Sequence, residues 1–152
     1  MATRAPKLLG DFGESIASHA LIRKGYEVLH VDHIGADLFA VKGEDRLAVS
    51  VKSRRFDPKE TRGFTIETAH INKLTDAAEM FGLSTLFAFV ASVKEHEAIH
   101  LFMIRCKDFG QLPSCEGGHR MRVSTKEIDK LINLPCVDYT RFSEQIASEL
   151  TC

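Results

Sequence analysis

The stretch of sequence that decides the fold is GADLFAVKGEDRLAVSVK, which runs from Gly35 to Lys52. Two short apolar segments flank the turn-forming residues Gly43-Glu44-Asp45, and this pattern predicts an antiparallel pair of strands. An acid, Asp37, begins the first strand, and a lysine, Lys52, ends the second. An acid and a lysine on neighbouring strands can meet, so this pair is the first candidate site.

The rest of the chain extends this pair into a definite order of elements. Apolar residues recur at three- and four-residue steps ahead of Gly25 and again ahead of Gly82, which predicts two amphipathic helices that end at glycine. The run from Thr85 to Ala91 is apolar almost throughout, as suits a buried strand in parallel pairing. The expected elements are a helix at 9–24, strands at 26–31, 36–41 and 46–52, a helix at 66–81 and a strand at 85–91.

Further elements are expected after this core. They are a strand at 99–104, a short helix opened by the capping box Ser124-x-x-Glu127, and a last helix at 141–150. The chain has 152 residues and no repeat, linker or low-complexity tract, which suits one hydrophobic core. We therefore expect a single α/β domain over residues 1–152, with a central mixed sheet flanked by helices and followed by C-terminal helices.

The charge of the chain is nearly balanced. It carries 20 Lys and Arg against 21 Asp and Glu, which excludes a globally basic nucleic-acid binder but allows a local basic patch. The N-terminus has no apolar segment of the signal-peptide kind, and no apolar run is long enough to span a membrane. We expect a cytoplasmic protein with no membrane association.

The cysteines predict no structural chemistry. The four cysteines lie far apart and form no Cys-x-x-Cys pair, so we expect reduced thiols. Cys106, Cys115 and His119 could be grouped as zinc ligands. Three loosely spaced ligands nevertheless fall short of a structural tetrahedral site.

Glu14 is the third residue of interest. It lies on the first expected helix, and Ala17 and Leu21, three and seven residues further on, belong to the apolar stripe. A carboxylate at the border of a buried stripe is informative because its desolvation is costly unless a cation or a donor compensates. We therefore expect Glu14 to point inward.

Together these segments resemble the PD-(D/E)xK nuclease superfamily, whose restriction-endonuclease-like fold also occurs in Holliday junction resolvases. The resemblance rests on residues 10–14, 26–29, 35–40 and 47–52 and on the helix and strand that follow. It implies that Glu14 and Asp37 help to bind a divalent metal, Mg²⁺ or Mn²⁺, and that Lys52 positions or activates the attacking water. A phosphodiester needs positive charge on its oxygens and a deprotonated nucleophile, which a carboxylate-bound Mg²⁺ supplies.

Ser50 departs from the family pattern, which has an acid or Gln two residues before the lysine. A serine hydroxyl is a poor ligand for a hard dication. In one explanation the ligand has moved to Glu67, which extends the sheet-facing stripe of the second helix by one turn; some restriction enzymes similarly pair Ser-Val-Lys with a glutamate of the next helix. In the other, the protein keeps the fold but cannot cut. His70, one turn after Glu67, is either a phosphate or water contact or a structural histidine.

The segment after Lys52 is polar and basic and contains Pro58, so we expect a loop over residues 53–63. Its position at the mouth of the proposed site favours contact with phosphates, although surface charges are often only solvated. The candidate nucleic-acid-binding residues are Arg54, Arg55, Lys59 and Arg62.

The sequence thus predicts a nuclease that hydrolyses DNA with Mg²⁺ or Mn²⁺. A homodimer would suit two cuts in a duplex. The alternative is a catalytically inactive nucleic-acid-binding or protein-interaction module of the same fold. A third class, an unrelated α/β protein that binds a small molecule, would require a deep apolar pocket away from Lys52, and the sequence has no phosphate loop or nucleophile elbow to support it.

Overall fold

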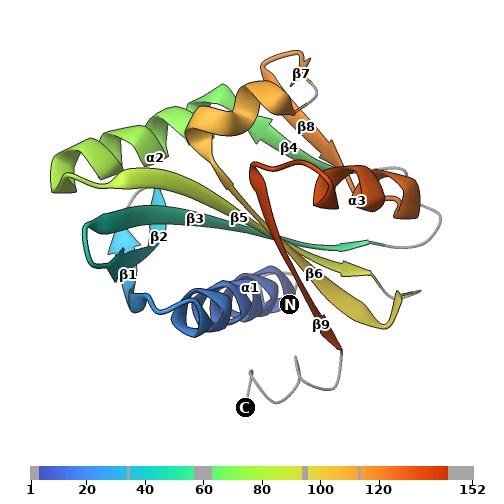
Figure 1. Cartoon of the computed structure of the whole chain (residues 1–152), viewed down its shortest axis with the longest axis horizontal. Coiled ribbons are helices and arrows are strands. Elements are labelled where there is room, and N and C mark those ends of the chain that lie inside the picture. Colours follow the sequence, from blue (N-terminus) through green and yellow to red (C-terminus); the bar gives the residue numbers. More distant parts are fainter. Residues whose placement is uncertain (1–3, 34, 57–62, 94–95, 113, 144–152) are drawn as a thin grey trace.

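The computed structural model describes residues 4–33, 35–56, 63–93, 96–112 and 114–143. A six-stranded sheet in the order β1-β2-β3-β5-β6-β9 forms the centre, with helix α1 (Arg4–Arg23) on one face and helix α2 (Thr68–Phe81) on the other (Figure 1). The strands are β1 (Glu27–His33), β2 (Ala36–Lys42), β3 (Asp45–Phe56), β5 (Ser84–Val93), β6 (Ala98–Arg105) and β9 (Val137–Ser143).

The pairing of the strands follows the predicted order. β1, β2 and β3 form an antiparallel meander, and β5, reached through α2, pairs with β3 in parallel. β6 and β9 then add antiparallel strands. α2 ends as expected at Gly82, whose φ of 66° is left-handed, a conformation that glycine adopts at little cost.

Each face of the sheet has its own apolar core, because alternate residues of a strand point to opposite faces. Leu47 and Val49 of β3 pack with α1, in a core that includes Ile16 and Leu21. Ala48 and Phe56 of the same strand belong to the core beneath α2, with Leu74 and three phenylalanines of β5 and β6: Phe87, Phe89 and Phe102. Lys52 is an even number of residues from Ala48 and Phe56, so it lies on the α2 face.

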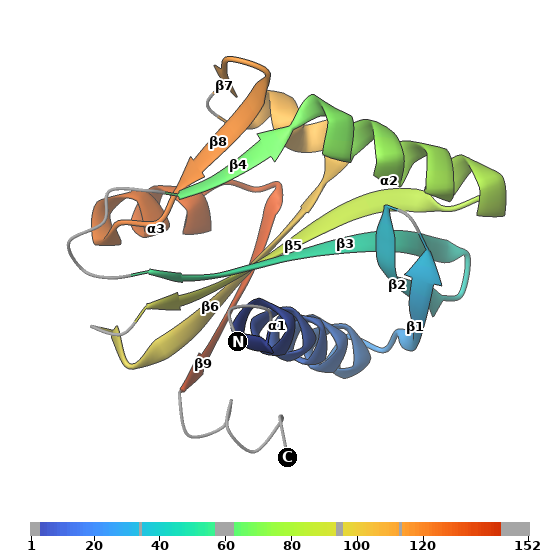
Figure 2. The same cartoon turned by 180° about the vertical axis from the view of Figure 1, so that it is seen from behind.

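The segment after Lys52 differs from the predicted loop. β3 continues to Phe56, and a further strand, β4 (Gly63–Glu67), precedes α2, which therefore begins at Thr68 rather than at Ile66. Phe64 and Ile66 are buried whereas Thr65 is exposed, which is the two-residue alternation of a strand. β4 pairs with β8 (Gly118–Arg122), and β8 pairs with β7 (Ser114–Cys115), in a second sheet (Figure 2).

The C-terminal part agrees with the prediction only at first. Helix α3 (Thr125–Ile132) begins as expected, because the Ser124 hydroxyl accepts a hydrogen bond from the Glu127 N–H at 3.4 Å. The predicted last helix, at 141–150, is wrong over its first residues, since β9 extends to Ser143 and buries Phe142 against the core beneath α1. Residues 144–152 lie outside the described part. Among the described helices, none is long and apolar enough to span a membrane.

Candidate active site at the fork between β2 and β3

Asp37 lies where β2 and β3 separate. Their last registered pair in this direction is Leu38 with Val49, while β3 continues beside β5. Beyond that pair, the Asp37 Oδ2 atom accepts a hydrogen bond of 2.7 Å from the Val51 N–H. The carboxylate thus accepts from a backbone N–H of β3 that has no hydrogen-bond acceptor on β2. This contact fixes one oxygen of Asp37 in the fork.

Gly35, two residues before Asp37, has a structural role. A Cβ built on Gly35 would lie 2.5 Å from the backbone oxygen of Lys73 on α2, and the φ of Gly35 is 97°. Both observations require glycine at this position, and the close approach holds the start of β2 against α2.

Glu14 reaches the fork from α1. A Cβ built on the preceding residue, Gly13, would lie 1.6 Å from the Ser53 Oγ atom and 3.4 Å from the Val51 Cγ1 atom. Gly13 therefore lets α1 lie close to β3, which brings Glu14 beside the fork. Burial raises the pKa of the Glu14 carboxyl, and the negative charge of Asp37 raises it further. The structure thus brings these two predicted residues into one electrostatic environment.

His30 is a neighbour that sequence reasoning missed. Its Nδ1 atom lies 3.7 Å from the Glu14 Oε2 atom, and its side chain is 56% exposed. This contact opposes the rise in the pKa of Glu14. The available signal was that His30 shares a strand face with Val28, which packs toward α1.

Lys52 follows Val51, the residue whose N–H contacts Asp37. Its side chain is half-buried and makes no hydrogen bond or ion pair to the described residues. Ser50, on the same strand face, is 6% exposed. Lys52 is therefore available at the fork, and Ser50, two residues before it, is a buried hydroxyl.

Glu67 lies at the last position of β4 and caps α2 without a side-chain hydrogen bond. Its side chain is exposed. The second sheet packs over the α2 face of the central sheet, so Glu67 is on the same side as Lys52. Within the described residues, however, no three His, Cys, Asp or Glu side chains form a group that could hold a metal. The structure therefore groups Glu14 with Asp37 but does not add Glu67.

His70, on α2, has a buried Nδ1 atom without a partner in the described part.

The predicted phosphate-binding residues are divided. The Arg54 Nη1 atom donates a hydrogen bond of 2.9 Å to the Gly63 carbonyl, and its guanidinium lies 5.8 Å from the centre of the Phe56 ring. Arg55 is exposed at the end of β3. Lys59 and Arg62 lie outside the described residues.

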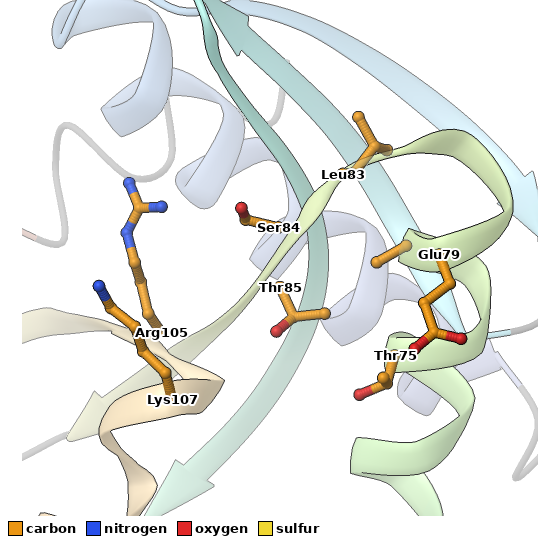
Figure 3. Close-up of a pocket in the computed structure, with 8 residues that line it drawn as sticks. Thr75, Glu79, Leu83, Ser84, Thr85, Arg105 and Lys107 are labelled. Atoms are coloured by element: carbon orange, nitrogen blue, oxygen red, sulfur yellow. The ribbon is translucent and has the colours of Figure 1, made fainter.

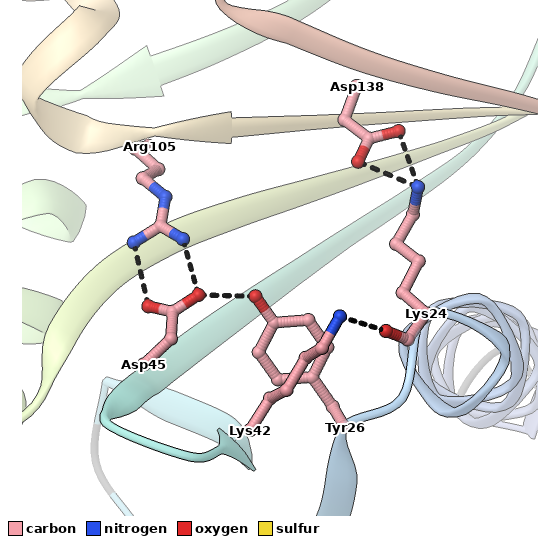
Figure 4. Close-up of polar contacts among 6 residues, drawn as sticks. All are labelled: Lys24, Tyr26, Lys42, Asp45, Arg105 and Asp138. Atoms are coloured by element: carbon pink, nitrogen blue, oxygen red, sulfur yellow. Dashed lines mark hydrogen bonds and ion pairs between the residues drawn. The ribbon is translucent and has the colours of Figure 1, made fainter.

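A network of charged groups holds the other end of β3 (Figure 4). Asp45 accepts hydrogen bonds of 2.8 Å and 3.2 Å from the Arg105 guanidinium and another from the Tyr26 hydroxyl. These donors lower the pKa of the Asp45 carboxyl. The contacts join β3 and β6 to Tyr26, the residue before β1, about 23 Å along β3 from Lys52 at the usual rise of a strand. This end supports the sheet and is remote from the fork.

Two cavities lie near Arg105, away from the fork. One of about 300 Å³ is lined by Thr75, Glu79, Ser84, Thr85, Arg105 and Lys107, among others (Figure 3). A second, of about 280 Å³, shares Arg105 and Lys107 with it. Both have charged side chains in their walls, so neither is the deep apolar pocket that a small-molecule function would require.

No family model matches the chain. Over 77 residues the chain is 32% identical to the UPF0102 protein of Parabacteroides distasonis. The aligned stretch makes up 48% of this chain and 64% of that protein. The chain thus spans less than two thirds of the length of that relative.

Among solved structures, the chain is similar to Hjc of Archaeoglobus fulgidus, a Holliday junction resolvase from an archaeal hyperthermophile. The TM-score is 0.54 at 13% sequence identity, and the match covers 80% of this chain and 93% of that chain. At this identity the likeness shows the fold alone. The chain has the restriction-endonuclease-like fold, with a central mixed sheet flanked by helices, as the sequence predicted.

Proposed function

We propose that this protein is a divalent-metal-dependent nuclease that hydrolyses DNA phosphodiester bonds. The observation that carries the proposal is the arrangement at the fork. There the Asp37 carboxylate accepts a hydrogen bond from the Val51 N–H in place of a bond between the strands. The charge of Asp37 acts on Glu14, and Lys52 is the next residue of β3 after Val51. The likeness to a Holliday junction resolvase supports DNA as the substrate. The UPF0102 relative is similar over part of the chain.

The donor set at the fork fits Mg²⁺ or Mn²⁺. These are hard cations that prefer oxygen, and Mg²⁺ is commonly bound by one or two carboxylates together with waters and substrate phosphates. Glu14 and Asp37 are such a pair. Burial raises the pKa of Glu14 and the charge of Asp37 raises it further, and a bound cation would offset both effects. When bound, the metal would lower the pKa of a water and polarise the phosphate.

The protein groups have separate roles in this proposal. The Val51 N–H orients the Asp37 carboxylate through one oxygen and leaves the other oxygen for the metal. Lys52, which has no partner among the described residues, donates to the attacking water or to the scissile phosphate. The Glu14 carboxylate is partly buried, so its attraction for a cation is screened less than it would be in water.

The second candidate is an inactive nucleic-acid-binding or interaction module of the same fold. Two observations favour it: Ser50 is buried where the family has an acid, and Glu67 is exposed at the end of β4. In the active form of the proposal, Glu67 is a further metal ligand that reaches the site when metal and DNA are present. A nuclease with only Glu14 and Asp37 as ligands is the alternative form.

The deciding experiment is cleavage of duplex and four-way-junction DNA with Mg²⁺ or Mn²⁺. Asp37→Asn is the sharpest variant, because its amide oxygen can still accept from the Val51 N–H while the charge is lost. We expect Asp37→Asn and Lys52→Ala each to reduce cleavage at least about 100-fold, and Lys107→Ala, an exposed lysine remote from the fork, to leave it unchanged. A parent protein that binds DNA but cuts neither substrate would favour the inactive module.

Glu67→Gln distinguishes the two forms of the metal site. If Glu67 is a ligand, cleavage by this variant requires a higher Mn²⁺ concentration than cleavage by the parent. An unchanged metal dependence would leave Glu14 and Asp37 as the pair that binds the metal.

A homodimer remains part of the proposal, because paired cuts in a duplex suit twofold symmetry. β1 is an edge strand of the sheet, and Leu29, on this strand, is 62% exposed. Sedimentation of the parent and of Leu29→Lys tests this point. A monomeric parent at working concentration would remove the dimer from the proposal.

A further inference from the structure

The outer face of the β4–β8 ribbon carries two arginines near the fork. Arg120 lies opposite Thr65, and Arg122 lies opposite Gly63, in the register of the two strands. The alternate residues Phe64 and Met121 are buried in the core beneath α2, so Arg120 and Arg122 belong to the face that points away from it. We call Arg120 and Arg122, with Arg54, the basic ribbon face.

This face is joined to the fork through Arg54. Arg54 is two residues after Lys52 on the same face of β3, about 7 Å further along the strand. Its guanidinium donates to the carbonyl of Gly63, the residue that pairs with Arg122. Positive side chains therefore follow one another from Lys52 and Arg54 on the central sheet to Arg122 and Arg120 on the second sheet, which lies over the central sheet (Figure 2).

The charges on the ribbon are sorted along its length. Glu67 ends β4 opposite Gly118, and Glu116 lies in the turn that precedes β8, so the acids are at the α2 end and the arginines at the β3 end. In the described part of the chain, neither Arg120 nor Arg122 forms an ion pair. Arg122 is exposed, and Arg120 is half-buried, with its Nε atom covered by the protein.

We propose that the basic ribbon face binds the phosphates of the DNA strand that extends from the scissile position at the fork. This inference rests on the proposed function and adds a binding surface beyond the loop predicted from the sequence. An anionic strand supplies acceptors for the arginines. The balanced charge of the whole chain makes such a local surface the source of affinity.

The test is DNA binding without cleavage, in Ca²⁺, measured by fluorescence anisotropy of a labelled duplex over a range of salt concentrations. The variant is Arg120→Gln with Arg122→Gln. The matched control is Arg46→Gln with Lys107→Gln, which removes two exposed positive charges near the other end of β3. Arg120→Lys with Arg122→Lys restores the charge, and thermal unfolding of each variant checks that it folds.

We expect the glutamine variant to bind about tenfold or more weakly, and the slope of log K against log salt to become shallower by about 2, one for each lost phosphate contact. The lysine variant should recover most of the affinity and the slope, and the control should match the parent. Equal binding by the glutamine variant and the control would overturn the inference and leave the nuclease proposal intact.

A failure of the nuclease proposal would give results different from a failure of the basic ribbon face. A parent that binds DNA with the expected dependence on these arginines but cuts nothing would remove the nuclease activity and keep the binding surface. A parent that does not bind DNA at all would overturn both.

Discussion

Acidification should destabilise the protein through one buried histidine. His100, on β6, is 3% exposed. Its Nε2 atom lies 2.9 Å from the His96 Nδ1 atom, and its Nδ1 atom lies 2.7 Å from the Tyr139 hydroxyl. Burial, followed by the positive charges of His96 and Arg141, lowers the pKa of His100 to about 4. The folded protein therefore holds this imidazole neutral at pH values where the unfolded chain would protonate it.

The size and sign of the effect follow from the two pKa values. The ordinary histidine pKa is 6.5, and that of folded His100 is about 4, so between these values the unfolded chain binds a proton that the folded chain does not. Stability is therefore full at pH 7 and falls as the pH is lowered. The loss from His100 should reach about 2 kcal/mol by pH 5 and about 3 kcal/mol by pH 4.

Urea unfolding followed by circular dichroism at several pH values between 4 and 7 measures this loss. The control is His100→Gln, which keeps a hydrogen-bond donor and acceptor but cannot titrate. Because every other titratable group is retained, the difference between the two pH dependences belongs to His100. If the free energies of unfolding of parent and variant run parallel between pH 7 and pH 4.5, the reasoning is wrong.

Three further predictions concern stability. Gly118→Ala places a Cβ 2.0 Å from the Ile66 carbonyl oxygen, so urea unfolding should show that the free energy of unfolding falls by about 1–3 kcal/mol. The control Gly110→Ala, whose Cβ would have nothing within 4 Å, should lower it far less. Equal losses in the two variants would contradict the close packing of β8 on β4. Gly10→Ala, in open space on α1, should raise the thermal midpoint by the equivalent of about 0.5–1 kcal/mol, and a lower midpoint would argue against helix at this position. Asp45→Asn should cost less than about 1 kcal/mol at neutral pH, because the pair with Arg105 is partly exposed. Since the pKa of Asp45 is lowered, this cost should vanish as the pH falls through that pKa, and a cost that persisted in acid would exclude the ion pair as its source.

The sequence predicted five of the six strands of the central sheet because these strands have clear patterns, and it missed β9. β5 is buried along most of its length, and continuous apolar character is typical of a strand covered on both faces. Glu14 and Asp37 were paired in advance only through the resemblance to the nuclease superfamily, and in the structure the charge of Asp37 acts on the Glu14 carboxyl.

β4 was missed for a physical reason. Ile66 fits both the alternation of a strand and the stripe of the helix that follows, and the preceding basic segment with Pro58 is typical of a loop. The partner that stabilises β4 as a strand is β8, more than fifty residues away. The contact between His30 and Glu14 is equally non-local, since it depends on how closely α1 packs on the sheet at Gly13. Local periodicity carries no information about either arrangement.

The end of the β2–β3 ladder at Leu38 and Val49 also affects how the sheet opens. The β1–β2 hairpin is joined to the rest of the sheet by five registered pairs, from Leu38–Val49 to Lys42–Asp45, whereas β3 and β5 share ten. Local unfolding begins where the fewest hydrogen bonds must break. The amide hydrogens of β1 should therefore exchange with solvent faster than those of β5, and Asp37, which accepts from β3 across the fork, is the contact that such an opening must break.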